Sequence, residues 1–187
     1  MIRDGAIIAR KTSFSWKRLV TIPFVFVIQI FTGSFCKRHL FKRGKYDHVA
    51  VFFHGKVLEY LFSTNGLYEV GIQEWSSKNV KKGVKFFYYN LTPALTAEQK
   101  ELSDKFLEEE RKAKREFSVK EAAISAIDNS IVNYDNPNVS FCSGFAERYL
   151  DYINVLSLRD DSTKSDPNEL IRRLVNSNLV QTKRRML

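Results

Sequence analysis

Two neighbouring β-rich runs constrain the fold of this chain more strongly than any other feature. Residues 48–53 (HVAVFF) and 56–62 (KVLEYLF) are rich in β-branched and aromatic side chains, and His54-Gly55 separates them. Two such runs joined by a short glycine-containing connection are typical of an antiparallel β-hairpin. The sequence therefore predicts that the fold contains an antiparallel sheet.

The length of the turn decides which side chains share a face of this hairpin. With a two-residue turn, Ala50 faces Glu59 and His48 faces Leu61. His48 and Glu59 are then diagonal neighbours on one face, about 7–8 Å apart at the backbone. A three-residue turn would move Glu59 to the opposite face.

A second strong pattern begins at Cys142. Apolar residues recur there at the spacing of one helix face: Cys142, Phe145, Ala146, Tyr149, Leu150 and Ile153. Cys142 lies at the start of this predicted helix, with Ser140 or Asn138 as the expected N-cap. Unpaired backbone N–H groups and the helix dipole favour a thiolate at that position. The alternative is a structural cysteine packed in the core.

A cysteine nucleophile needs a neighbouring base, and histidine is the usual one. The chain has three histidines. His39 lies among lysines and arginines, and His54 lies in the predicted turn, so both are expected at the surface. His48 begins a strand and is the candidate base, although a purely structural histidine is the alternative.

Composition indicates a folded globular protein. The chain has 187 residues, with 44% hydrophobic and 13% aromatic residues, which suits one domain with a sizeable core. We predict a single domain over residues 1–180 and a frayed basic tail over 181–187. Only two cysteines, Cys36 and Cys142, are present, so a disulfide framework is not expected and a reducing compartment is.

The formal net charge is +9. Basic side chains crowd together in one segment: Lys37, Arg38, Lys42, Arg43 and Lys45. Such a cluster is either solvated surface or a contact for an anionic partner such as acidic lipid or a cell-wall polymer. The sequence has no recognisable nucleic-acid motif, which makes nucleic acid the weaker candidate.

The N-terminal region predicts a cytoplasmic location. The first residues lack the cleavage site of a signal peptide. The apolar run 19–31 contains Pro23 and Gln29 and is too short to span a bilayer. We expect it to belong to a core helix over residues 16–31, with peripheral membrane contact as the alternative.

The remaining elements follow from periodicity and capping signals. We predict strands after Asp4 and over 84–89, a helical or irregular connection over 73–79, and helices over 97–115, 118–131 and 168–177. Thr96 and Asp166 are the expected N-caps of the first and last of these helices.

The order of the motifs resembles the circularly permuted papain-like fold of the NlpC superfamily, especially its YiiX/YebB-like branch, to which lecithin:retinol acyltransferase is related. Five short segments carry the resemblance: Asp4-Gly5-Ala6-Ile7-Ile8, Thr32-Gly33-Ser34 with Tyr46-Asp47-His48-Val49-Ala50-Val51, Val57-Leu58-Glu59 with Gly66-Leu67-Tyr68-Glu69-Val70, Phe141-Cys142-Ser143, and Ser165-Asp166-Pro167-Asn168-Glu169-Leu170. The chain departs from the family pattern at Gly144 and Phe145, where Glu-Leu is usual, and at Ala50, where glycine is common.

The resemblance implies an α+β fold in which a small, mainly antiparallel sheet packs against helices and the nucleophile lies at a helix N-terminus. It implies Cys142 as nucleophile, His48 as base and Glu59 as the orienting group, without a metal or another cofactor. Tyr46, Ser140 and Ser143 are further candidates near the site. The backbone N–H of Cys142 is expected to contribute to an oxyanion hole.

Three functions fit these observations. The first is a thiol-dependent amidase or peptidase that acts on peptidoglycan or a peptide-like amide. The second is a lipid-acting acyl hydrolase or acyltransferase, which the apolar run and the basic segment favour. The third is a non-enzymatic protein that binds an anionic partner.

Overall fold

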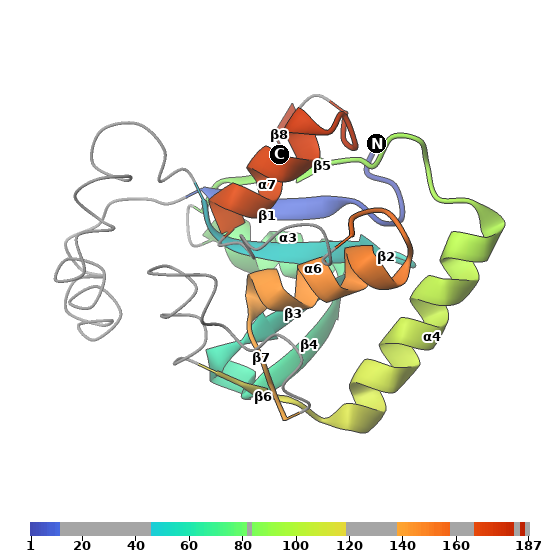
Figure 1. Cartoon of the computed structure of the whole chain (residues 1–187). Coiled ribbons are helices and arrows are strands. Elements are labelled where there is room, and N and C mark those ends of the chain that lie inside the picture. The colour runs from blue at the N-terminus through green and yellow to red at the C-terminus, as the bar shows by residue number, and fades with distance from the viewer. Residues whose placement is uncertain (12–45, 82–83, 119–137, 158–166, 182–183, 186–187) are drawn as a thin grey trace, which may run out of the picture.

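The computed structural model describes residues 1–11, 46–81, 84–118, 138–157, 167–181 and 184–185 (Figure 1). Several expectations lie outside these residues: the helix over 16–31, Cys36, His39, the basic segment 37–45, the N-cap Asp166, and the helix over 118–131 except for Ser118, which is not helical.

A six-stranded sheet forms the centre of the fold, in the order β4-β3-β2-β1-β5-β8. Its strands are β1 (Ile7–Lys11), β2 (Tyr46–Phe53), β3 (Lys56–Leu61), β4 (Gly66–Gly71), β5 (Phe86–Tyr89) and β8 (Arg184–Arg185). Every pairing in this sheet is antiparallel. The fold is therefore α+β with an antiparallel sheet, as predicted.

The β2–β3 hairpin has the predicted two-residue turn. Val51 pairs with Leu58, and Phe53 pairs with Lys56. His54 and Gly55 both have positive φ angles, 49° and 73°, as a type I′ turn requires. This register places His48 and Glu59 on the same face of the sheet.

Helices cover both faces of the sheet (Figure 1). They are α3 (Ile72–Lys81), α4 (Ala97–Ala113), α6 (Cys142–Tyr152) and α7 (Pro167–Asn176). Helices α4, α6 and α7 share one core with the Ile7 and Val51 face of the sheet. Helix α3 covers the other face, where Trp75 packs in a second core with Ile8, Ala50 and Val57.

The capping signal at Thr96 located the start of α4 correctly. The Thr96 side chain accepts a hydrogen bond from the Gln99 backbone, and the Gln99 side chain accepts one from the Thr96 backbone, which completes a capping box at the start of α4. Lys114 adopts a left-handed conformation directly after α4. The connection over 73–79 is helical, within α3.

The structure corrects two expectations about strands. Strand β4 was not predicted, because its residues alternate little between apolar and polar and it lies at the sheet edge. The tail was expected to be frayed, but Arg184 and Arg185 pair with Tyr88 and Phe87. This pairing satisfies backbone groups of β5 that would otherwise lie at an exposed edge.

A short second sheet leads into α6. Strand β6 (Glu116–Phe117) pairs in parallel with β7 (Val139–Ser140). Strand β7 ends two residues before α6 begins, so this pairing holds the chain that enters the cysteine helix. None of the helices in the described part of the chain is long and apolar enough to cross a membrane.

Candidate active site

The hairpin brings an imidazole and a carboxylate into direct contact. Nε2 of His48 lies 2.7 Å from Oε2 of Glu59. Both side chains are buried, with 9% and 7% of their surfaces exposed. A hydrogen bond to a charged partner is strong in such a site, because little water competes for it. The predicted proximity of His48 and Glu59 is therefore confirmed.

Glu59 is held by a second donor that the sequence did not reveal. The indole Nε1 of Trp75 on α3 donates a hydrogen bond to Oε1 of Glu59 over 2.9 Å. Burial by itself would raise the pKa of Glu59, but the hydrogen bonds from His48 and Trp75 and the positive charges of His48 and Arg10 bring it below its ordinary value. Glu59 is therefore an ionised carboxylate at neutral pH.

Cys142 is the first residue of α6, as predicted, and the residue is partly buried. Neither expected N-cap is correct. The N-cap is Phe141, whose backbone is extended and whose side chain makes no capping bond. Ser140 is unavailable because it lies in β7 and its Oγ accepts a hydrogen bond from Arg148 over 2.9 Å. The N–H groups at the start of α6 therefore lack a side-chain cap.

Cys142 and His48 interact with each other. Burial opposes charge on the Cys142 thiol, yet the charge and hydrogen bond of His48, a hydrogen bond with the Val49 backbone and the charge of Arg10 lower its pKa. Burial likewise opposes charge on His48, but Cys142 and Glu59 raise its pKa to about 9. The two groups thus shift each other's pKa toward the thiolate and the imidazolium.

The two ring nitrogens of His48 have separate partners. Since Nε2 is bonded to Glu59, Nδ1 is the nitrogen left to face the thiol. A carboxylate on the far nitrogen fixes the tautomer and stabilises the imidazolium. The arrangement can therefore activate a sulfur nucleophile and return a proton to a leaving group.

Arg10 is a second residue that sequence reasoning missed. In the β1–β2 pairing Arg10 lies opposite His48, next to a register shift between Arg10 and Lys11. Cross-strand partners share a sheet face, so Arg10 extends the row that contains His48. The register of β1 against β2 would have indicated this position of Arg10. The pattern of apolar residues within β1 does not reveal that register.

The hydroxyl groups of the other predicted near-site residues differ in their hydrogen bonding. The hydroxyl oxygens of Tyr46 and Tyr89 lie 2.6 Å apart in the core. The Ser140 hydroxyl is engaged by Arg148, as described above. The Ser143 hydroxyl is buried and has no hydrogen-bond partner in the described part of the chain.

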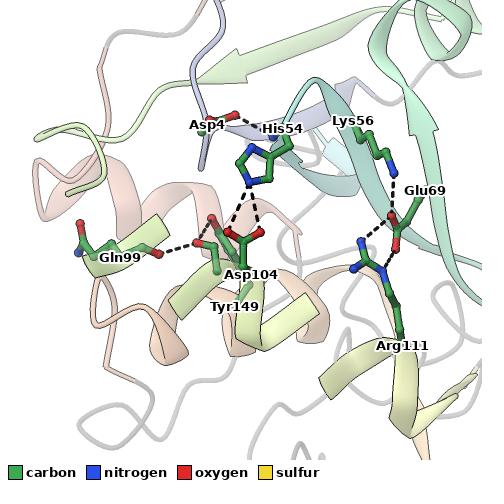
Figure 2. Close-up of polar contacts among 9 residues, drawn as sticks. Asp4, His54, Lys56, Glu69, Gln99, Asp104, Arg111 and Tyr149 are labelled. Atoms are coloured by element: carbon green, nitrogen blue, oxygen red, sulfur yellow. Dashed lines mark hydrogen bonds and ion pairs between the residues drawn. The ribbon is translucent and has the colours of Figure 1, made fainter. Parts of the chain in front are cut away.

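His54 lies at the surface, away from these contacts, as predicted. Its Nε2 is 3.2 Å from a carboxylate oxygen of Asp104, and its backbone N–H donates to Asp4 over 2.9 Å (Figure 2). The His54 and Asp104 side chains are more than half exposed. His54 is thus a turn residue that joins the hairpin to α4.

Comparison with known proteins gives one distant likeness. No protein-family model matches the chain, and neither does any curated protein. The crystal structure of the metalloprotein yiiX from Escherichia coli O157:H7 is similar over 84% of this chain and 68% of its own, with 16% sequence identity and a TM-score of 0.45. Among the described residues of the present chain, no three His, Cys, Asp or Glu side chains are grouped so that they could hold a metal ion.

Proposed function

We propose that this protein is a thiol-dependent hydrolase of the amidase or peptidase type, with a permuted papain-like fold of the NlpC kind. One observation supports this most directly. Cys142 begins α6 beside a buried His48, and the far nitrogen of that imidazole is 2.7 Å from the Glu59 carboxylate. Nucleophile, base and orienting group thus occur in the order that acyl transfer needs.

In the first half of the reaction the Cys142 thiolate attacks the carbonyl carbon of an amide. The new S–C bond places the negative charge on the carbonyl oxygen. The Cys142 backbone N–H, which has no acceptor within α6, is a donor for that oxygen. As the C–N bond breaks, the His48 imidazolium gives its proton to the departing amine, which leaves a thioester on Cys142.

In the second half a water molecule attacks the thioester. The neutral His48 takes a proton from the water, and the C–S bond breaks. The acid product leaves and the Cys142 thiolate is restored beside the imidazolium. Glu59 remains an anion throughout, and its role is to hold and stabilise the imidazolium.

The substrate class is proposed from the sequence resemblance: an amide of peptidoglycan or peptide type. A lipid-acting acyl hydrolase or acyltransferase is the second candidate, and its support comes from the apolar run 19–31 and the basic segment 37–45, which lie outside the described residues. In both cases an anionic surface, either cell wall or acidic lipid, would bind the basic segment.

The decisive experiment exposes the protein to a panel of peptidoglycan fragments, peptides and acyl lipids and follows product and intact mass. We expect turnover, and an added acyl mass on Cys142 with slow substrates. Cys142→Ala and His48→Ala should abolish turnover without unfolding the protein, whereas His39→Ala and His54→Ala should retain it. Full activity in His48→Ala would refute the proposed base, and unchanged alkylation kinetics at Cys142 in that variant would refute the thiolate pair.

A further inference from the structure

We propose that Trp75 is a positioning residue that aims the Glu59 carboxylate at His48. The inference rests on the proposed function, since it gives Trp75 a role only if Glu59 supports His48. It extends the site from the β2–β3 hairpin to helix α3 on the same face of the sheet.

The two oxygens of Glu59 are divided between two partners. Oε2 meets His48 Nε2 at 2.7 Å, and Oε1 accepts from Trp75 Nε1 at 2.9 Å. One hydrogen bond alone would allow the carboxylate to rotate about its side-chain axis. Two bonds to different oxygens fix that rotation, so Oε2 stays in line with the imidazole.

Trp75 is itself held firmly, as a positioning residue must be. Its side chain is buried, with 3% of its surface exposed. Its ring packs against Phe86 of β5, with ring centroids 4.3 Å apart. The backbone N–H of Ile72, at the start of α3, donates to the Gly55 carbonyl over 3.0 Å. The indole is thus packed against β5, and the start of its helix is bonded to the hairpin turn.

The hydrogen bond from Trp75 influences the ionisation of Cys142 through Glu59 and His48. The Trp75 hydrogen bond favours the ionised form of Glu59, Glu59 favours the imidazolium of His48, and the imidazolium favours the Cys142 thiolate. An indole has only a donor, so Trp75 can support the carboxylate but cannot take its proton. Loss of the indole N–H should therefore lower the thiolate fraction at Cys142.

The test is a double-mutant cycle in which the alkylation rate of the Cys142 thiol is measured. It does not require the substrate to be known. The rate of iodoacetamide alkylation at Cys142 is measured near pH 6 by peptide mass spectrometry. Trp75→Phe should slow it by about three- to tenfold, since part of one charge-assisted hydrogen bond is lost. In a Glu59→Gln background the same change should have little further effect, because Trp75 acts through Glu59. If Trp75→Phe slowed alkylation by the same factor in the unaltered protein and in Glu59→Gln, the inference would be overturned.

Phe52→Leu is the matched control for packing. Phe52 belongs to the same core cluster as Trp75, and its replacement removes aromatic packing but no hydrogen bond to Glu59. This variant should alkylate at the rate of the unaltered protein. A slowing equal to that of Trp75→Phe would assign the effect to loosened packing and overturn the role of the indole N–H.

A second measurement keeps the inference testable if Trp75→Phe does not fold. The chain has two tryptophans, and Trp16→Phe assigns their two indole N–H signals in the NMR spectrum. Glu59→Gln should shift the Trp75 signal and leave that of Trp16 in place, and an unmoved Trp75 signal would contradict the contact.

If Glu59→Gln itself leaves alkylation unchanged, the proposed triad fails. If only Trp75→Phe has no effect, the positioning role alone fails.

Discussion

At the level of single residues, the charge state of Cys142 depends on side chains from two neighbouring strands, β1 and β2. Burial disfavours a thiolate, and a helix start offers only partial compensation. His48 from β2 supplies the largest opposing effect, and Arg10 from β1 adds to it. The lowered pKa of the thiol is therefore due to the residues that surround it.

The pH dependence of Cys142 alkylation follows from these shifts. As the pH rises through the lowered pKa of Cys142, the thiolate forms below the usual thiol range near pH 8.5. The imidazolium partner is lost only as the pH rises through about 9. At pH 6–7 we expect Cys142 to react with iodoacetamide at least about tenfold faster than Cys36. Equal rates at the two cysteines would contradict the ion pair.

Arg10 should contribute measurably to the stabilisation of the Cys142 thiolate. Arg10→Gln removes a positive charge that lowers the pKa of both Cys142 and Glu59, so the pH midpoint of alkylation should rise. The expected slowing near pH 6 is about two- to fivefold, as befits a partly screened charge. Lys11→Gln is the matched control: Lys11 is the next residue of β1 and is exposed. An identical shift in both variants would mean that net charge alone is responsible.

At the level of helices and strands, two residues that follow Cys142 in α6 have a clear packing role. A Cβ on Gly144 would lie 3.0 Å from the Phe141 ring, so glycine leaves space for the N-cap residue. Phe145 is fully buried and packs between Tyr60 and Phe106, with ring centroids 5.3 and 5.7 Å away. Gly144 and Phe145 thus serve the packing of the first turns of α6.

Helix α7 holds the beginning of β2 through one side chain. The Asn168 amide accepts from the Tyr46 N–H and donates to the Tyr46 carbonyl, each over 2.8 Å. Asn168→Ala should lower the free energy of unfolding by about 1–3 kcal/mol and speed amide exchange at Tyr46. Asn176→Ala, at the exposed end of α7, should have almost no effect. Equal urea midpoints for the two variants would contradict this account.

At the level of the whole molecule, a buried charge cluster joins three segments that are far apart in sequence. Glu110 of α4 accepts hydrogen bonds from Tyr60 of β3, from Arg148 of α6 and from Arg115. Arg148 also donates to Ser140, just before the cysteine helix. The cluster therefore connects α4 to the residues that precede α6 and to strand β3.

Removal of the Glu110 charge should be costly. Glu110→Gln leaves two guanidinium groups without their buried counter-charge, and such losses typically reduce the free energy of unfolding by about 3–5 kcal/mol. Glu108→Gln, on the exposed face of α4, breaks only a surface pair with Lys112 and should leave the stability unchanged. Thermal melts of the two variants check this, and similar melting temperatures would refute a structural role for the cluster.

Much of the fold could be read from local patterns. The hairpin register followed from the His54-Gly55 turn, the start of α4 followed from Thr96, and the position of Cys142 followed from the apolar stripe of α6. The contact between His48 and Glu59 could be predicted because both residues lie on one hairpin, where strand geometry fixes their separation.

The remaining features depend on contacts between segments distant in sequence. Trp75 reaches Glu59 only because α3 folds back over the sheet, and Arg10 lies beside His48 only because β1 inserts next to β2. The β8 pairing likewise required the edge of β5 to be in place. The sequence by itself determined the β2–β3 hairpin, its turn and the starts of α4 and α6, since these obey short-range periodicity and capping. Only the tertiary structure decided which side chains surround the thiol, because their charges and hydrogen bonds act across space between elements that periodicity cannot relate.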